Sequence, residues 1–255
     1  PFCCLNVAKL PAMSWANDTV ASLAVGDVIP GKMKGLVLNC SWPMPEKVQS
    51  AYDVFREGLI DATPKEAYVY PASTLHCTIC TFRAFTAGPL EDEVGHMGRW
   101  LEVLSKARSS PQWPKGSFRL KMGKPTLEGS AGIFRFEDVD GAITLMRQAL
   151  RDAILAQGGQ AAEGIDRSKA KTLPGTPEGE PPPHLPDIVH STVLRWTKEP
   201  KVPREEVLQI FQKISETWEP MEVKVAVAKA VLEDIPYMHI PDDKAHVWWR
   251  WDAED

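Results

Sequence analysis

The sequence predicts an α+β fold of two similar lobes, related by a pseudo-twofold axis, each with an antiparallel sheet and helices. Strands and helices alternate along the chain, and the order motif strand, helix, strand, strand occurs twice. The 255 residues, 44% hydrophobic and 25% charged, suffice for one such domain with a buried core. We expect residues 1–34 to form an N-terminal extension and residues 35–252 to form a single bilobal domain.

The first half of the chain predicts two strand and helix pairs. Residues 35–42 are an apolar run typical of a buried strand, and residues 45–61 place apolar side chains at helical spacing. Residues 74–82 are rich in strand-forming Thr, Ile and Phe. Residues 90–107 predict a second helix. Its expected apolar face holds Leu90, Val94, Met97, Leu101 and Leu104.

The middle of the chain predicts a hairpin, a helix and a long loop. Residues 117–124 and 131–138 are expected to be the two hairpin strands, followed by a helix over 140–156. Residues 157–186 are dense in Gly, Pro and charge and show no periodicity, which predicts a long surface loop. Such loops are often functional, although a tolerated insertion explains this one at least as well.

The second half repeats the opening pattern. Residues 187–196 predict a strand, and residues 203–218 predict a helix. Alternating valines at the start of residues 221–234 predict one further strand, and residues 244–251 predict the last. The repeat therefore places two equivalent strands, 74–82 and 187–196, in the two halves.

These two equivalent strands carry the same motif, an apolar residue followed by His-x-Thr and a second apolar residue. The first is LHCTI at 75–79, and the second is VHSTV at 189–193. Residues i and i+2 of a strand point to the same face, so each histidine shares a face with its threonine. If the halves pack symmetrically, one H-x-T from each lobe lines a central cleft.

The chemistry of this set suits a phosphate ester. One imidazole can act as general base while the other acts as general acid, because histidine titrates near neutral pH. The hydroxyls of Thr78 and Thr192 can donate hydrogen bonds to phosphate oxygens. This predicts His76, Thr78, His190 and Thr192 as catalytic residues, with no metal or cofactor required. A structural role is the common one for a single histidine in a strand, but the matched flanks and matched positions favour function.

Three stretches of the sequence resemble a known family. They are GLVLNCSWPMPEKVQ at 35–49, VYPASTLHCTICTF at 69–82 and PDIVHSTVLRW at 186–196. They are similar to the opening and the two motifs of the 2H phosphoesterase superfamily, which includes RNA 2′,5′-ligase-like proteins and cyclic phosphodiesterases. The resemblance implies two α/β lobes around a cleft, with His76 and His190 as the catalytic pair. It also implies phosphate binding by Thr78 and Thr192.

Other residues are candidates for substrate binding. Phe82 and Trp196 each lie six positions after a motif histidine, so strict strand alternation places them on the cleft face, where they could stack a base. Packing in the core is the alternative for both. Tyr237 lies in a loop that could reach a nucleotide or simply connect two strands. The same alternation places Arg195 on the opposite face from His190, and Arg83 is ambiguous.

Composition limits the partners. The net charge of −5 argues against a long nucleic-acid duplex and favours a nucleotide or an RNA end. Five cysteines without framework spacing predict free thiols in a reducing compartment, which favours the cytoplasm, with the nucleus as the alternative. We also expect the protein to be a monomer. The sequence holds no apolar run long enough to span a membrane. Cys77 and Cys80 form a lone C-x-x-C within a predicted strand, so we expect no metal site there.

These observations favour a metal-independent phosphodiesterase acting on a 2′,3′-cyclic nucleotide or an RNA-end phosphate. The resemblance implies a 2′-phosphate product. A 2′,5′-linked oligonucleotide or a cyclic phosphate on ADP-ribose stays open as the substrate. Two other hypotheses remain: a nucleotide-sensing module of the same fold with little turnover, and an RNA-processing subunit that recruits a partner through the loop at 157–186.

Overall fold

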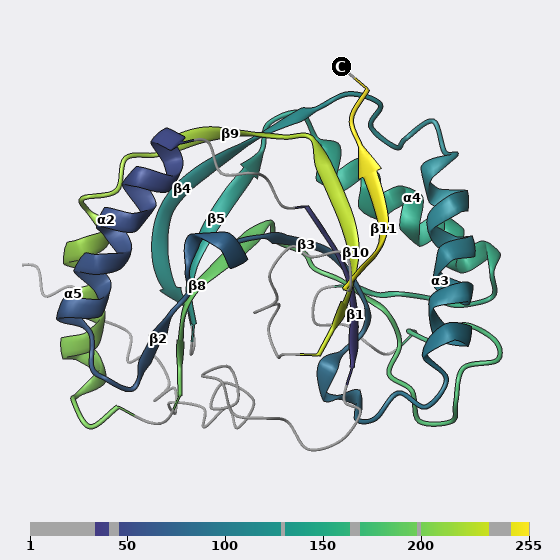
Figure 1. The fold of residues 1–255 in the computed structure, drawn as a ribbon, viewed down its shortest axis with the longest axis horizontal. Helices are drawn as coiled ribbons and strands as arrows, with labels where there is room; N and C mark the ends of the chain where they lie inside the picture. Colours follow the sequence, from purple (N-terminus) through teal and green to yellow (C-terminus); the bar gives the residue numbers. More distant parts are fainter. Residues whose placement is uncertain are drawn as a thin grey trace, which may run out of the picture.

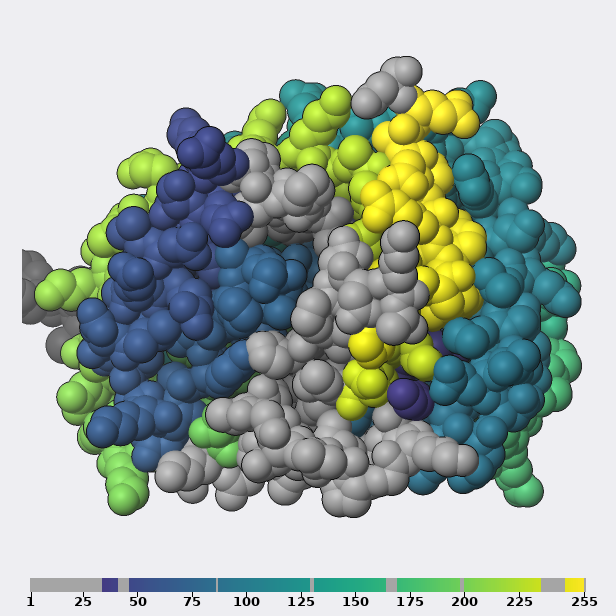
Figure 2. All heavy atoms as spheres, in the orientation of Figure 1, coloured from purple at the N-terminus to yellow at the C-terminus, as the bar shows by residue number. Residues whose placement is uncertain are grey.

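Two antiparallel-rich sheets form the centre of the molecule, and helices cover the outer face of each (Figure 1). The computed structural model describes residues 34–40, 46–128, 131–163, 169–197, 200–234 and 246–254. The predicted α+β class is confirmed. In the same view drawn as spheres, α2 lies on one side of the molecule and β11 and α3 lie on the other (Figure 2).

We name each sheet by the motif strand that it contains. The β3 sheet has the order β11 (Val247–Asp252), β10 (Val227–Glu233), β1 (Gly35–Cys40), β3 (Cys77–Arg83), β7 (His184–Leu185) and β6 (Ala162–Glu163). The β8 sheet has the order β2 (Ala67–Val69), β8 (His190–Trp196), β5 (Ala131–Asp138), β4 (Phe118–Glu128) and β9 (Met221–Val225). Neighbouring strands run antiparallel except for the short parallel pair of β6 and β7.

Two long helices cover each sheet. The β8 sheet is covered by α2 (Glu46–Ala62) and α5 (Arg204–Ser215), and the β3 sheet by α3 (Glu93–Arg108) and α4 (Ala142–Ala156) (Figure 1). The apolar stripe of α2 is buried as its spacing predicts, with Val48, Tyr52, Phe55 and Leu59 facing the core. Two short 3₁₀ turns, η1 (Ala72–Thr74) and η2 (Phe85–Ala87), flank β3.

The buried face of α3 differs from the expected one. Val94 and Leu101 are exposed, at 79% and 40% of their surface. Trp100 sets the orientation instead, because its ring stacks on Phe82 of β3 with the ring centroids 4.5 Å apart. The buried residues of the helix are His96, Trp100, Val103, Leu104 and Ala107. A large aromatic ring thus outweighs two aliphatic side chains in placing this helix.

The expected single strand over 221–234 is two strands in different sheets. β9 pairs with β4 in the β8 sheet, whereas β10 pairs with β1 and β11 in the β3 sheet. The chain changes sheets at Ala226, whose carbonyl oxygen accepts a hydrogen bond from the amide of Ala253 at 2.8 Å. The order motif strand, helix, strand, strand occurs in both halves, but each sheet takes strands from both halves of the chain.

Residues 157–163 and 169–186, the described parts of the expected surface loop, contain two short strands. These are β6 and β7, and β7 pairs with β3 through Thr81 and His184. Glu180 is nearly buried, and its carboxylate lies 2.8 Å from Nε of Arg83 and 3.7 Å from Nε2 of His96. The segment thereby extends the edge of the β3 sheet.

Among the described residues, no helix is both long enough and apolar enough to cross a membrane.

Candidate active site

The two H-x-T motifs lie side by side where the two sheets meet. The amide of His76 donates a hydrogen bond to Oγ of Ser191 in the second motif at 3.2 Å. His76, Thr78, His190 and Thr192 are all partly exposed, whereas Cys77 and Ser191 between them are buried. The structure thus brings the four predicted catalytic side chains to one region, on the open faces of their strands.

The first imidazole has a defined tautomer. Nδ1 of His76 lies 2.8 Å from the carbonyl oxygen of Thr74 in the turn before β3. A carbonyl oxygen only accepts, so Nδ1 carries the proton and Nε2 keeps its lone pair. Burial lowers the pKa of His76 to about 4, and the bond to Thr74 opposes part of that shift. His76 is therefore neutral at pH 7, with Nε2 able to accept a proton.

The second imidazole lies in a more charged environment. Burial is the main cause that lowers the pKa of His190, and nearby arginines lower it further. Glu128 on β4 opposes this shift. Arg135 is the register partner of His190 on β5, and it donates two 2.6 Å hydrogen bonds to the carboxylate of Glu128. The arginines that act on His190 are Arg195, Arg147 and Arg135.

A bulge follows the threonine in each motif strand. The pairing skips Ile79 between Thr78 and Cys80, and it skips Val193 between Thr192 and Leu194. An extra residue reverses the alternation of side chains beyond it. The bulge occurs at the same place in both motifs, which is independent evidence of the internal repeat.

The second bulge corrects the expected position of Arg195. Strict alternation predicts Arg195 on the face opposite His190, but Arg195 lies on the side of the histidines, and its charge lowers the pKa of both His76 and His190. The guanidinium also interacts with the hydroxyl of Tyr70, whose pKa is raised by burial. The only sequence signal for this residue was its place after the second motif in the resemblance.

Tyr70 is held firmly against the site. Its amide donates to the carbonyl oxygen of Val193 on β8 at 2.9 Å. Its own carbonyl oxygen accepts hydrogen bonds from the Tyr52 hydroxyl at 2.7 Å and from Nε of Arg56 at 3.1 Å. Because Tyr70 is 1% exposed, its ring forms a fixed support beside Arg195.

The same bulges turn Phe82 and Trp196 away from the site. Phe82 is 1% exposed and packs on Trp100, and Trp196 is 2% exposed in the main core. The core-packing alternative describes both rings, so we do not retain them as base-stacking residues. Arg83 is also structural, because it donates to the carbonyl oxygens of Lys34, Gly88 and Pro89. Tyr237 lies outside the described residues.

The lone C-x-x-C provides two buried thiols. Cys77 and Cys80 are both fully buried, and burial raises the pKa of each above its ordinary value. Thiols in this state are poor nucleophiles and poor metal ligands. Over the part of the chain that the structure describes, no group of three or more His, Cys, Asp or Glu side chains is arranged to hold a metal ion.

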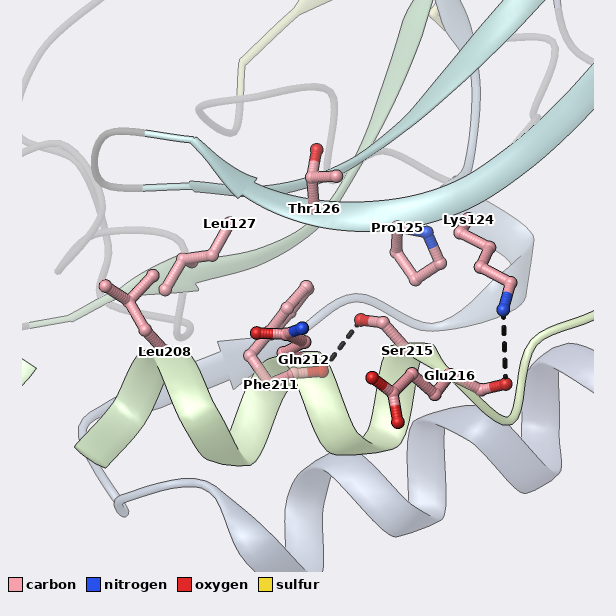
Figure 3. A pocket seen from close by; sticks show the side chains of 9 residues that line it. All are labelled: Lys124, Pro125, Thr126, Leu127, Leu208, Phe211, Gln212, Ser215 and Glu216. Atoms are coloured by element: carbon pink, nitrogen blue, oxygen red, sulfur yellow. Dashed lines mark hydrogen bonds between the residues drawn. The ribbon is translucent and has the colours of Figure 1, made fainter. Parts of the chain in front are cut away.

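A separate pocket of about 490 Å³ lies between β4 and α5 (Figure 3). Phe211 and Leu208 line it from the helix, opposite Pro125 and Leu127 of β4. Across its far end, Nζ of Lys124 lies 3.4 Å from the carbonyl oxygen of Glu216. None of the four motif residues lines this pocket.

Paired H-x-T motifs on strands of two antiparallel-rich sheets form the arrangement that the resemblance to the 2H phosphoesterase superfamily implies.

No protein-family model matches the chain, and no curated protein matches it. Several solved structures are similar in fold. TT0787 of Thermus thermophilus has a TM-score of 0.45 and 14% identity, covering 77% of this chain and 87% of its own. E. coli LigT complexed with 3′-AMP has a TM-score of 0.47 and 12% identity, covering 87% of this chain and 99% of its own. Kluyveromyces marxianus Usb1 has a TM-score of 0.42 and 12% identity, covering 81% of this chain and 98% of its own.

Proposed function

We propose that this protein is a phosphodiesterase that opens a 2′,3′-cyclic phosphate on a nucleotide or an RNA end. The observation that carries the proposal is the adjacency of the two H-x-T motifs, tied together by the hydrogen bond from His76 to Ser191. Two imidazoles in one site supply both proton transfers that hydrolysis of a phosphodiester needs. Each role in the reaction is then filled by a side chain.

His76 acts as the general base. Its Nε2 lone pair takes a proton from water, because Nδ1 is committed as a donor to Thr74. A base with a pKa of about 4 is almost fully deprotonated at pH 7, so it is ready in every molecule. The activated water attacks phosphorus and forms the new P–O bond.

His190 acts as the general acid. It donates a proton to the ribose 3′-oxygen as the P–O3′ bond breaks, which leaves the phosphate on the 2′-oxygen. The lowered pKa of His190 makes it a strong acid but a scarce one in the unbound protein. A bound phosphate anion raises that pKa by favouring the imidazolium. Solvent then returns both imidazoles to their starting states.

Thr78, Thr192 and Arg195 bind the phosphate in this proposal. The two hydroxyls donate to non-bridging oxygens, and the guanidinium neutralises the negative charge that grows in the transition state. Support from Tyr70 keeps Arg195 in place, so little reorganisation is required during the reaction.

The surface charges support a small substrate or an RNA end. A long nucleic acid needs unpaired cations along its path. Three exposed cations of β4 and β5 instead face carboxylates: Arg119 with Asp140 at 2.9 Å, Lys121 with Glu137 at 3.8 Å, and Arg135 with Glu128 at 2.6 Å. The local charge along this sheet is thus balanced.

A substrate panel in the presence of EDTA tests the proposal. The panel holds the four 2′,3′-cyclic nucleotides, 2′,5′-linked oligonucleotides and RNA with a cyclic end, with products separated by chromatography. We expect EDTA-resistant conversion of a cyclic phosphate to a 2′-phosphate. Binding without turnover across the whole panel would instead identify a nucleotide-sensing module. Loss of turnover in EDTA, restored by a divalent cation, would contradict the side-chain mechanism.

A further inference from the structure

One buried arginine connects the first motif strand to the segment just before the second. Arg147 lies on α4 with 8% of its surface exposed. Its guanidinium donates to the carbonyl oxygens of Thr78 at 2.9 Å and Ile79 at 3.3 Å on β3. It also donates to the carbonyl oxygen of Ile188 at 3.0 Å, two residues before His190. A single side chain therefore joins the backbone of the first motif to the segment that leads into the second.

We propose that Arg147 is a positioning residue that sets the spacing between the two H-x-T motifs. This inference rests on the proposed phosphodiesterase function. The hydrogen bond from the His76 amide to buried Ser191 links the two motifs directly, and Arg147 links β3 to the segment that leads into β8. Fixed at two separate points, the strands cannot slide or splay without breaking a buried hydrogen bond.

The guanidinium is the group that this task requires. It is planar, carries five donors in a rigid fork and stays charged when buried, even though burial lowers the pKa of Arg147. A lysine ammonium is a compact point charge that cannot span the carbonyl oxygens of β3 and that of Ile188 together. Lysine at this position therefore keeps the positive charge but cannot bind all three carbonyl oxygens. Methionine keeps most of the side-chain length but has neither the charge nor the hydrogen-bond donors.

The positive charge of Arg147 also lowers the pKa of His190, the proposed general acid. The groups that act on His190 are Arg195 on its own strand, Arg147 on α4, Arg135 on β5 and Glu128 on β4. The three cations favour neutral imidazole, and Glu128 opposes them. Removing the cation on α4 raises the pKa of His190, whereas exchanging it for lysine does not.

The chain offers a matched control in Arg83. It is 2% exposed and, like Arg147, it donates to three backbone carbonyl oxygens, those of Lys34, Gly88 and Pro89. It also binds Glu180. These contacts anchor segments around β3, and within the described part of the chain none of them joins β3 to β8. If the loss of any buried arginine lowers activity, substitutions of Arg147 and Arg83 should lower it equally. If the spacing of the motifs matters, only the substitution of Arg147 should do so.

The experiment compares Arg147→Lys, Arg147→Met and Arg83→Lys in the full chain. Thermal unfolding, kcat and KM on the best cyclic nucleotide, and histidine titration by NMR are measured for each. We expect Arg147→Lys to lower kcat by about tenfold to a hundredfold, as for displaced catalytic groups, with a Tm close to that of Arg83→Lys. We expect Arg83→Lys to keep kcat within about threefold. Arg147→Met should raise the pKa of His190.

The outcomes separate this inference from the proposed function. Unchanged kcat in Arg147→Lys, or an equal loss in Arg83→Lys, overturns the positioning role. Absence of turnover in the wild-type protein overturns the proposed function. The NMR titration of His190 is then the only test of the link between Arg147 and the second motif. In that case, a rise of the His190 pKa in Arg147→Met but not in Arg147→Lys supports the link between α4 and the second motif. An unchanged His190 pKa overturns it.

Discussion

The two motif strands are alike in sequence and backbone but differ in their surroundings. Each has His-x-Thr followed by a bulge at the next residue. His76 is fixed by the Thr74 carbonyl oxygen and has a pKa of about 4. His190 instead lies among three arginines and one glutamate. In the proposed mechanism this difference gives the repeated motif two roles, because neighbours outside the motif determine which imidazole accepts a proton and which donates one.

The largest expected effect comes from removing either imidazole. We expect His76→Ala and His190→Ala each to lower kcat/KM by about a hundredfold or more, the usual contribution of an acid–base group. Steady-state kinetics on a 2′,3′-cyclic nucleotide measures this. Full activity in either variant would mean that only one motif works, and the comparison between them would lose its functional meaning.

Removing a threonine hydroxyl should have a smaller effect. Thr78→Val and Thr192→Val each remove one donor to a charged phosphate oxygen, a hydrogen bond that contributes about 1.5–3 kcal/mol. We expect a drop in kcat/KM of roughly tenfold to a hundredfold, with Thr→Ser restoring most of it. Equal losses would show that both strands bind the phosphate. A loss at one position alone would assign phosphate binding to one strand.

The pH dependence should reveal the two different histidines. His76 works as a base when deprotonated, above a pKa of about 4. His190 works as an acid when protonated, below a pKa that is lowered from 6.5. The profile of kcat/KM, which reports the unbound enzyme, should therefore fall below about pH 4 and fall again as the pH rises through the lowered pKa of His190, with its maximum below pH 6.5. An optimum above pH 7 would contradict the assigned environments.

The smallest effect on catalysis should come from the rings that the bulges turn into the core. Phe82→Leu removes a stacked partner of Trp100 and should lower the free energy of unfolding by roughly 1–2 kcal/mol. We expect KM to stay within about twofold, because the ring does not reach the site. Denaturant unfolding and nucleotide titration check the two parts. A KM raised well beyond twofold with unchanged stability would show that Phe82 contacts the substrate after all.

Much of the fold and the central part of the site follow from local pattern. The apolar stripe of α2 and the repeated apolar-His-x-Thr-apolar sequence are visible without any tertiary information. A bulge is not, because one inserted residue leaves strand propensity unchanged while it reverses every later side chain. That is why strict alternation places Phe82, Trp196 and Arg195 on the wrong face, although core packing of the two rings is the alternative that the sequence also allows.

The remaining differences depend on long-range contacts. Alternation runs on from β9 into β10 although the two strands belong to different sheets. The burial of Glu180 depends on Arg83, which lies far from it in sequence. Arg147 stands among apolar residues of α4, and only the tertiary structure shows the three carbonyl oxygens that it binds.

The most direct test of the division of roles is a substrate whose leaving group needs no acid. A 3′-deoxynucleoside 2′-(p-nitrophenyl) phosphate keeps the phosphate on the 2′-oxygen and releases p-nitrophenolate, which departs without protonation. We predict that His190→Ala recovers most of the wild-type rate on this ester, measured by nitrophenolate absorbance, while His76→Ala stays about a hundredfold or more slower. Recovery of His76→Ala with persistent loss in His190→Ala would reverse the roles and contradict this account.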